Sequence, residues 1–131
     1  MTPELEALAR RAVACPKWRW MDGMRVLSLA WAYDGPSHPY RFRGDFHNRP
    51  NPTAYPDLTD PATLGCLLAL VREVYPGCYA EPNGAPAWDG MDERERDSWW
   101  RVYSFGRRIP RPIGFGPIEA AALVAALEAA P

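Results

Sequence analysis

The sequence predicts an α+β fold, in which a small antiparallel sheet is packed with about three helices in one compact domain, residues 1–131. Three segments repeat apolar residues at helical spacing, and two short segments are rich in aromatic and β-branched residues, as strands are. The predicted order is helix, strand, loop, helix, strand, helix. We interpret this order, which has only two predicted strands, as α+β: a small antiparallel sheet with helices packed on it.

The helix predicted over residues 60–75 has the clearest start and stop signals. Asp60 is a good N-cap, Pro61 suits the first helical position, and Pro76-Gly77 ends the helix. Its main apolar stripe consists of Leu64, Leu67, Leu68, Val71 and Tyr75. Because further apolar residues widen this stripe, we expect the helix to be central and covered on more than one side.

Two more helices are predicted near the ends of the sequence. Thr2 and Pro3 begin the first, whose buried stripe is Leu5, Leu8, Ala9 and Ala12. The last follows Gly116-Pro117, and its stripe is Ala120, Leu123, Val124 and Leu127. The apolar residues of 120–130 are either a core face or the contact face of a homodimer.

Two strands are predicted. Residues 24–33 are apolar on both faces, which suits a central strand, and residues 98–105 form the second. The segment 34–59 is rich in proline, which fixes φ and removes backbone donors. We therefore expect mostly loop there, with at best a short edge strand at residues 40–46.

Composition excludes several classes of protein. A net charge of -1 is that of neither a generally basic nucleic-acid coat nor a strongly acidic DNA mimic. Three cysteines without C-x-x-C spacing favour a reducing compartment over a disulfide framework or metal cage. Neither a signal peptide nor an apolar run of about 20 residues is present, so a soluble, cytoplasmic protein with no membrane partner is expected.

One segment carries a resemblance. P-D-L-T-D-P-A-T-L-G-C-L-L-A-L-V-R-E at residues 56–73 resembles a recurring segment of small uncharacterised proteins of GC-rich bacteriophages and prophages. Residues 18–24, 99–103 and 119–130 match the same proteins in type and order. The resemblance implies a phage protein acting in the cytoplasm of the host bacterium. Such accessory proteins commonly bind a host-defence protein or sequester a nucleotide signal, and the resemblance carries over no catalytic residue.

Catalysis, a metal and a cofactor are not expected. No nucleophile elbow is present, and neither histidine lies in a recognisable Ser–His or Cys–His motif. The possible metal ligands Asp34, His38, Asp45 and His47 fit no zinc spacing. The segment G-F-G-P-I-E at residues 114–119 begins like a phosphate-binding glycine loop, but Glu119 would repel an anion. A turn before a helix is the favoured interpretation.

Two clusters mix arginine with aromatic residues, the combination that stacks a nucleobase and holds a phosphate. The first consists of Arg41, Phe42, Arg43, Phe46, His47 and Arg49, and the second of Trp99, Arg101, Tyr103, Phe105, Arg107, Arg108 and Arg111. The alternative is that the aromatic residues pack under the proline-rich loop while the arginines pair with the acidic run 92–97.

Within these clusters the predicted binding residues are Arg41, Phe42, Arg43, His47, Trp99, Arg101, Tyr103, Arg107 and Arg108. We expect the two clusters to converge on one surface. The predicted partner is a host protein or an anionic small ligand such as a nucleotide, and a homodimer is one way to build a pocket. A nucleic-acid-binding module is the alternative function.

Overall fold

The computed structural model describes residues 2–28, 31–32, 35–36, 38–44, 50–82, 90, 99–104 and 111–131. Packing divides the chain into two compact units, Met1–Ala14 with Trp18–Cys66, and Cys15–Lys17 with Leu67–Pro131. A single domain over residues 1–131 stays a prediction, because this division does not test whether either unit folds alone.

The first helix, α1 (Pro3–Ala14), begins as predicted. The Leu5 N–H donates to the Thr2 hydroxyl at 3.3 Å, which satisfies one of the free donors of the first turn. Leu8, Ala9 and Ala12 are buried, whereas Leu5 is only partly so. The helix packs against β5 (Tyr55–Pro56), where the Arg10 guanidinium lies 4.7 Å from the centre of the Tyr55 ring.

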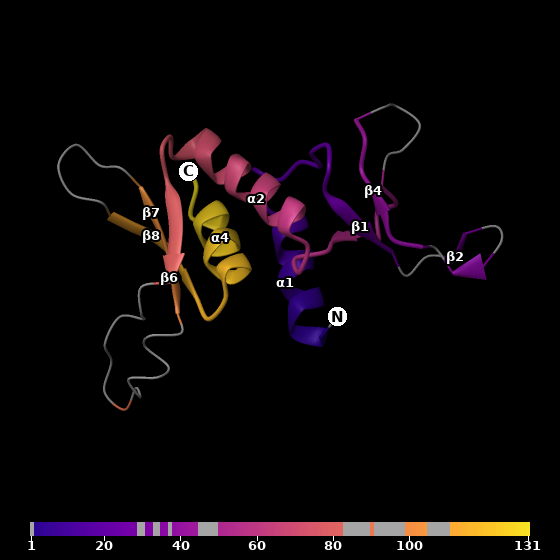
Figure 1. Cartoon of the computed structure of the whole chain (residues 1–131), viewed down its shortest axis with the longest axis horizontal. Coiled ribbons are helices and arrows are strands. Elements are labelled where there is room, and N and C mark those ends of the chain that lie inside the picture. The colour runs from indigo at the N-terminus through magenta and orange to yellow at the C-terminus, as the bar shows by residue number, and fades with distance from the viewer. Residues whose placement is uncertain are drawn as a thin grey trace. The chain divides into compact units, whose positions relative to one another are not determined.

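The sheet of the first unit has the order β4-β1-β5, with β1 (Arg25–Leu27) in the middle and β4 (Tyr40–Arg41) at one edge (Figure 1). The predicted central strand and edge strand are therefore confirmed in position but are too long. The strand β1 ends at Leu27, and Trp31–Ala32 (β2) pairs separately with Gly35–Pro36 (β3). The ladder stays short because Pro56 removes a donor from one partner strand and Pro39 precedes the other.

The helix α2 (Pro61–Val74) is where the sequence predicts it, and it contributes residues to both units. Its buried side differs from the predicted stripe. Leu67, Leu70 and Val71 are at most 1% exposed, whereas Leu64 and Leu68 are only partly buried. The buried side of α2 is thus narrower than the apolar face that the sequence predicts.

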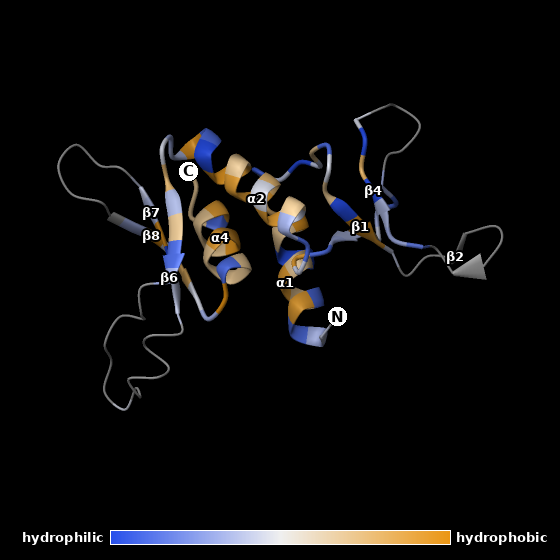
Figure 2. Ribbon diagram, in the orientation of Figure 1, coloured by the Kyte–Doolittle hydropathy of each residue, from blue (hydrophilic) through white to orange (hydrophobic). Residues whose placement is uncertain are grey.

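The sheet of the second unit consists of β6 (Tyr79–Pro82), β7 (Trp100–Ser104) and β8 (Arg111–Gly116), all antiparallel, with β7 in the middle. Only β7 was predicted. The helix α4 (Glu119–Glu128) lies against one face of this sheet (Figure 1) and is largely apolar (Figure 2). Its whole predicted stripe is buried, so the core-face interpretation is confirmed and a homodimer would need another surface.

Gly114 and Gly116 belong to β8, so the predicted turn is confined to Pro117 and Ile118, and the predicted helix follows from Glu119. An added Cβ at Gly114 would lie 2.7 Å from the backbone nitrogen of Ala126 and also against the carbonyl oxygen of Ala122. At Gly116 it would lie 2.8 Å from the backbone nitrogen of the same Ala122. These glycines therefore let α4 approach the strand closely, which is a packing role and not a phosphate-binding one.

The α+β class is confirmed, with three helices and two three-stranded sheets among the described residues in place of one sheet. None of the described helices has the length and apolar character that a membrane span requires.

Candidate functional site

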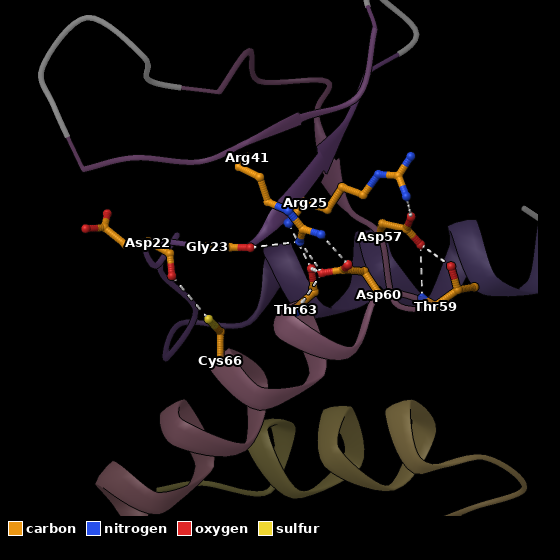
Figure 3. Close-up of polar contacts among 9 residues, drawn as sticks. All are labelled: Asp22, Gly23, Arg25, Arg41, Asp57, Thr59, Asp60, Thr63 and Cys66. Carbon is orange, nitrogen blue, oxygen red and sulfur yellow. Dashed lines mark hydrogen bonds and ion pairs between the residues drawn. The ribbon is translucent and has the colours of Figure 1, made fainter.

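Arg41 of the first cluster is part of an ion pair at the start of α2 (Figure 3). Its guanidinium donates from Nη1 to Asp60 Oδ2 at 2.5 Å and from Nη2 to Asp60 Oδ1 at 2.7 Å. Nη1 also donates to the Gly23 carbonyl at 3.0 Å. The Asp60 side chain is only 7% exposed, whereas that of Arg41 is 48% exposed. This bidentate geometry fixes the edge strand β4 to the N-terminus of α2.

Asp60 is also the N-cap of α2. Its Oδ2 accepts hydrogen bonds from the Thr63 N–H at 2.9 Å and the Thr63 hydroxyl at 2.8 Å. The Thr63 oxygen in turn accepts the Arg25 N–H at 2.8 Å, so a fully buried threonine joins the helix to β1. The hydrogen bonds from Arg41 hold the pKa of Asp60 far below its usual range, and those from Thr63 add to the effect, against the opposing effect of burial.

A second ion pair balances the charges of this network. Arg25 and Arg41 are directly opposite partners in the β1–β4 pair, and the Arg25 guanidinium lies 3.6 Å from Asp57 Oδ2. Asp57 also accepts from the Thr59 N–H at 3.0 Å and the Thr59 hydroxyl at 2.6 Å. Two carboxylates therefore neutralise two neighbouring guanidinium groups. Three Nη hydrogen bonds within the chain give Arg41 a structural role at the start of α2, and its predicted part in binding stays a prediction.

The rest of the first cluster is only partly described. The Phe42 ring lies 6.1 Å from that of Trp20, and Trp20 lies 5.5 Å from Trp18 in an edge-on arrangement. Arg43 is exposed. The contact between Phe42 and Trp20 could not be predicted, because the two residues lie far apart in the sequence and no periodic pattern connects them. Phe46, His47 and Arg49 lie outside the described residues.

The second cluster is centred on β7. Val102 is fully buried and directly opposite Gly114, on the face that α4 covers. Because side chains alternate along a strand, Arg101 lies on the other face, as predicted. The Arg101 Cζ atom lies 5.7 Å from the centre of the Phe115 ring, and Nη1 donates to the Tyr103 hydroxyl at 3.4 Å.

Tyr103 connects this contact to β6. Its ring stacks on that of Tyr79 with 5.4 Å between centroids and 24° between planes. We call the set Tyr79, Arg101, Tyr103 and Phe115 the aromatic face. Tyr103 is only 9% exposed and is thus more buried than predicted, whereas the other three side chains are partly exposed. Trp99, which precedes β7, is also partly exposed.

Arg101 is the charged residue of the aromatic face, and most of its hydrogen-bond donors have no acceptor among the described residues. Its Nε atom is buried and has no hydrogen-bond partner, and the single hydrogen bond of its guanidinium within the described part of the chain is the one to Tyr103. Glu81 is its direct partner in the β6–β7 register, but no ion pair joins the two. A partly buried charge without a counter-charge is unfavourable, which distinguishes Arg101 from the neutralised Arg25 and Arg41.

Part of the second cluster lies outside the residues that the structure describes. Phe105, Arg107, Arg108 and the acidic run 92–97 lie outside the described residues, and Arg111 is placed in β8 by its backbone. Arg41 and Arg101 belong to different units. Convergence of the two clusters on one surface therefore stays a prediction.

The pKa values of two of the cysteines, Cys66 and Cys78, are raised. All three are free thiols, and Cys15 and Cys78 are buried. Burial raises the pKa of Cys66, as do the nearby carboxylates of Asp60 and Asp22. Burial also raises the pKa of Cys78, although Arg72 acts in the opposite direction. Thiolates, the nucleophilic form, are thus disfavoured at both positions.

Within the described ranges, no three His, Cys, Asp or Glu side chains are grouped so that they could hold a metal ion. His38 is exposed, and the other possible ligands, Asp34, Asp45 and His47, lie outside those ranges.

No family model, curated protein or solved structure matches this chain.

Proposed function

We propose that this chain is a binding protein without enzymatic turnover, that its partner is another protein, and that the aromatic face is its binding surface. The observation that carries the proposal is the environment of Arg101, a partly buried guanidinium among three aromatic rings with a buried Nε that has no acceptor. Fully satisfied surfaces do not leave such a group, because an unsatisfied polar atom away from water is costly.

The residue types support a protein partner. Tyrosine, tryptophan and arginine are the residues that most often dominate the binding energy of protein interfaces, and they do so where they are packed and partly desolvated. The aromatic face has two tyrosines, one phenylalanine and one arginine on a rigid three-stranded sheet. A rigid surface of this kind loses little conformational entropy when a partner binds.

The charge of this face argues for a protein partner over nucleic acid. The described strands of the sheet contain two arginines, Arg101 and Arg111, and one carboxylate, Glu81, so their net charge is only +1. Nucleic-acid binding requires several cations on the phosphate backbone. The alternative function would depend on Arg107, Arg108 and the first cluster, and Arg41 of that cluster already pairs with Asp60.

The resemblance of residues 56–73 to small phage proteins supports a host-defence protein in the bacterial cytoplasm as the target. A nucleotide signal is the second class of partner that this resemblance implies, and it predicts retention of a small anionic ligand instead of a co-purified protein.

A capture experiment from bacterial lysate tests the proposal. The immobilised full-length chain is compared with Phe115→Ala, which truncates the aromatic face, and with Ile118→Ala, a matched truncation of a side chain that is 41% exposed. We expect the wild type and Ile118→Ala to retain the same protein and Phe115→Ala to lose it, with thermal melts confirming that each variant is folded.

Salt separates the partner classes. Raising salt from 50 to 200 mM weakens a contact with six to ten phosphates by about 10³–10⁵-fold, whereas we expect less than a tenfold change here. Capture unaffected by Phe115→Ala, a steep salt dependence with bound nucleic acid, or multiple turnover of a nucleotide, peptide or ester substrate would each contradict the proposed function.

A further inference from the structure

Arg101 has hydrogen-bond donors that no described residue accepts. Its Nη1 makes one long hydrogen bond, at 3.4 Å, and neither Nη2 nor Nε has an acceptor among the described residues. Arg41, by contrast, donates two hydrogen bonds to the Asp60 carboxylate in bidentate fashion. Among the described residues, no acidic side chain pairs with the Arg101 guanidinium.

The surroundings of Arg101 limit which acid fits. The Phe115 ring lies 5.7 Å from Cζ, and the stacked Tyr79 and Tyr103 rings are beside the guanidinium on the same face. An acidic group arriving there is accompanied by apolar contact, so its neighbours on the partner should be apolar or aromatic. A planar carboxylate matches the planar fork of the guanidinium.

The negative charge of the incoming group also limits which acid fits beside Arg101. Glu81 is directly across from Arg101 on β6. A carboxylate adds one negative charge beside Arg101 and Glu81, whereas a phosphate adds nearly two and is repelled more strongly by the Glu81 carboxylate.

Building on the proposed function, we propose that the aromatic face recognises an acidic residue flanked by apolar residues in the partner protein, and that the acidic carboxylate pairs with Arg101. The recognised element is a short peptide segment containing Asp or Glu. This goes beyond the choice of a protein partner, because it states which group of the partner provides specificity.

An array of nine-residue peptides tests this inference without knowledge of the partner. Each peptide has Leu, Phe or Trp at the flanking positions, and its central residue is Asp, Glu, Asn, Gln or phosphoserine. The full-length wild type should bind Glu or Asp peptides about tenfold more tightly than the matching Gln or Asn peptides, a typical difference for a charge-assisted pair.

The variants assign this preference to one residue. Arg101→Gln should reduce the Glu-to-Gln ratio to about one while the dependence on apolar flanks persists, and Arg101→Lys should keep part of the ratio, because lysine retains the charge but not the fork. Arg43→Gln removes an exposed arginine of the other unit and should leave the ratio unchanged. In ¹⁵N–¹H NMR spectra, the Arg101 Nε–H resonance, identified by its loss in Arg101→Lys, should move with the Glu peptide and not with the Gln peptide.

Each other outcome is decisive. Equal binding of Glu and Gln peptides, with Phe115→Ala still abolishing both, overturns the carboxylate and leaves the proposed function standing. Tighter binding of the phosphoserine peptides than of the Glu peptides would show that the aromatic face recognises phosphate and not a carboxylate. Binding by no peptide above the level of Phe115→Ala overturns this inference, whereas the proposed function is overturned only when capture from lysate is also unaffected by Phe115→Ala.

Discussion

Replacing Gly114 by alanine introduces one methyl group where α4 meets β8, and it should destabilise the protein. The added Cβ would lie 2.7 Å from the backbone nitrogen of Ala126 and 2.9 Å from the Ala126 Cβ. These atoms belong to the helix backbone or are fixed to it, so relief requires α4 to move by several tenths of an ångström. Overpacking of this kind costs about 1–3 kcal/mol, and because no flexible side chain can yield, we expect about 2–3 kcal/mol.

Gly65→Ala is the matched control, since it makes the same chemical change within α2. Gly65 is exposed, and an added Cβ there meets nothing within 4 Å. Alanine in a helix interior is more favourable than glycine by about 0.5–1 kcal/mol, so this variant should be more stable than the wild type. One substitution type is thus expected to have opposite signs at two positions.

Urea unfolding followed by circular dichroism measures the change in the free energy of unfolding, and thermal unfolding measures the change in melting temperature. For a chain of this size, 1 kcal/mol corresponds to about 3–5 °C, so melting should fall by about 6–15 °C in Gly114→Ala and rise by about 2–5 °C in Gly65→Ala. If the two units unfold separately, only one transition should respond to Gly114→Ala. An unchanged or raised melting temperature in Gly114→Ala would refute the close approach of α4 to β8.

Three further predictions concern the core, the ion pair and the thiols. Leu70→Ala empties a position that is 1% exposed and should cost about 2–5 kcal/mol, whereas Leu68→Ala, at a partly buried position, should cost clearly less; equal losses in urea unfolding would contradict the observed burial. The pKa of Asp60 is lowered in the folded state, so its contribution to stability is present above the unfolded pKa of about 4 and is lost as pH falls below it. Asp60→Asn should therefore be less stable than the wild type at pH 7 and nearer to it at pH 3, and a constant difference between the two would count against the pairing with Arg41. Burial raises the pKa of both Cys66 and Cys78, so both should react slowly with a maleimide at pH 7, with partly exposed Cys66 modified before buried Cys78; rapid modification of Cys78 in the folded protein, read by mass spectrometry, would show that it is accessible.

Local signals made the helices predictable. Thr2-Pro3 and Asp60-Pro61 begin α1 and α2 where expected, because a capping side chain and a proline act within one turn of the chain. The strand β8 was not predictable in this way. Its proline and two glycines are typical of a turn, and they are accommodated in a strand only because β7 pairs with it and α4 packs closely over it.

The candidate site was predictable where one strand contains it. Alternation along β7 placed Arg101 and Tyr103 on one face, and the structure confirms that they share it. Phe115 and Tyr79 joined this face through strand pairings that leave no trace in the local sequence. The pairing of Arg41 with Asp60 was missed for the same reason, because 19 residues separate the two and the acidic partner already had an assigned role as a helix cap.

The two sets of bonds at Asp60 also differ in the order in which a folding chain can form them. Those to Thr63 span three residues, so they require little loop closure and can form with the first turn of α2. The bonds from Arg41 to Asp60 span 19 residues. The bond from the Arg25 N–H to the Thr63 hydroxyl, which joins the same helix start to β1, spans 38 residues. These long-range bonds must wait for the intervening chain to close, which slows folding. The start of α2 is thus expected to form early as a nucleus that β1 and β4 join later, and a substitution at Arg41 should mainly speed unfolding and change the folding rate little.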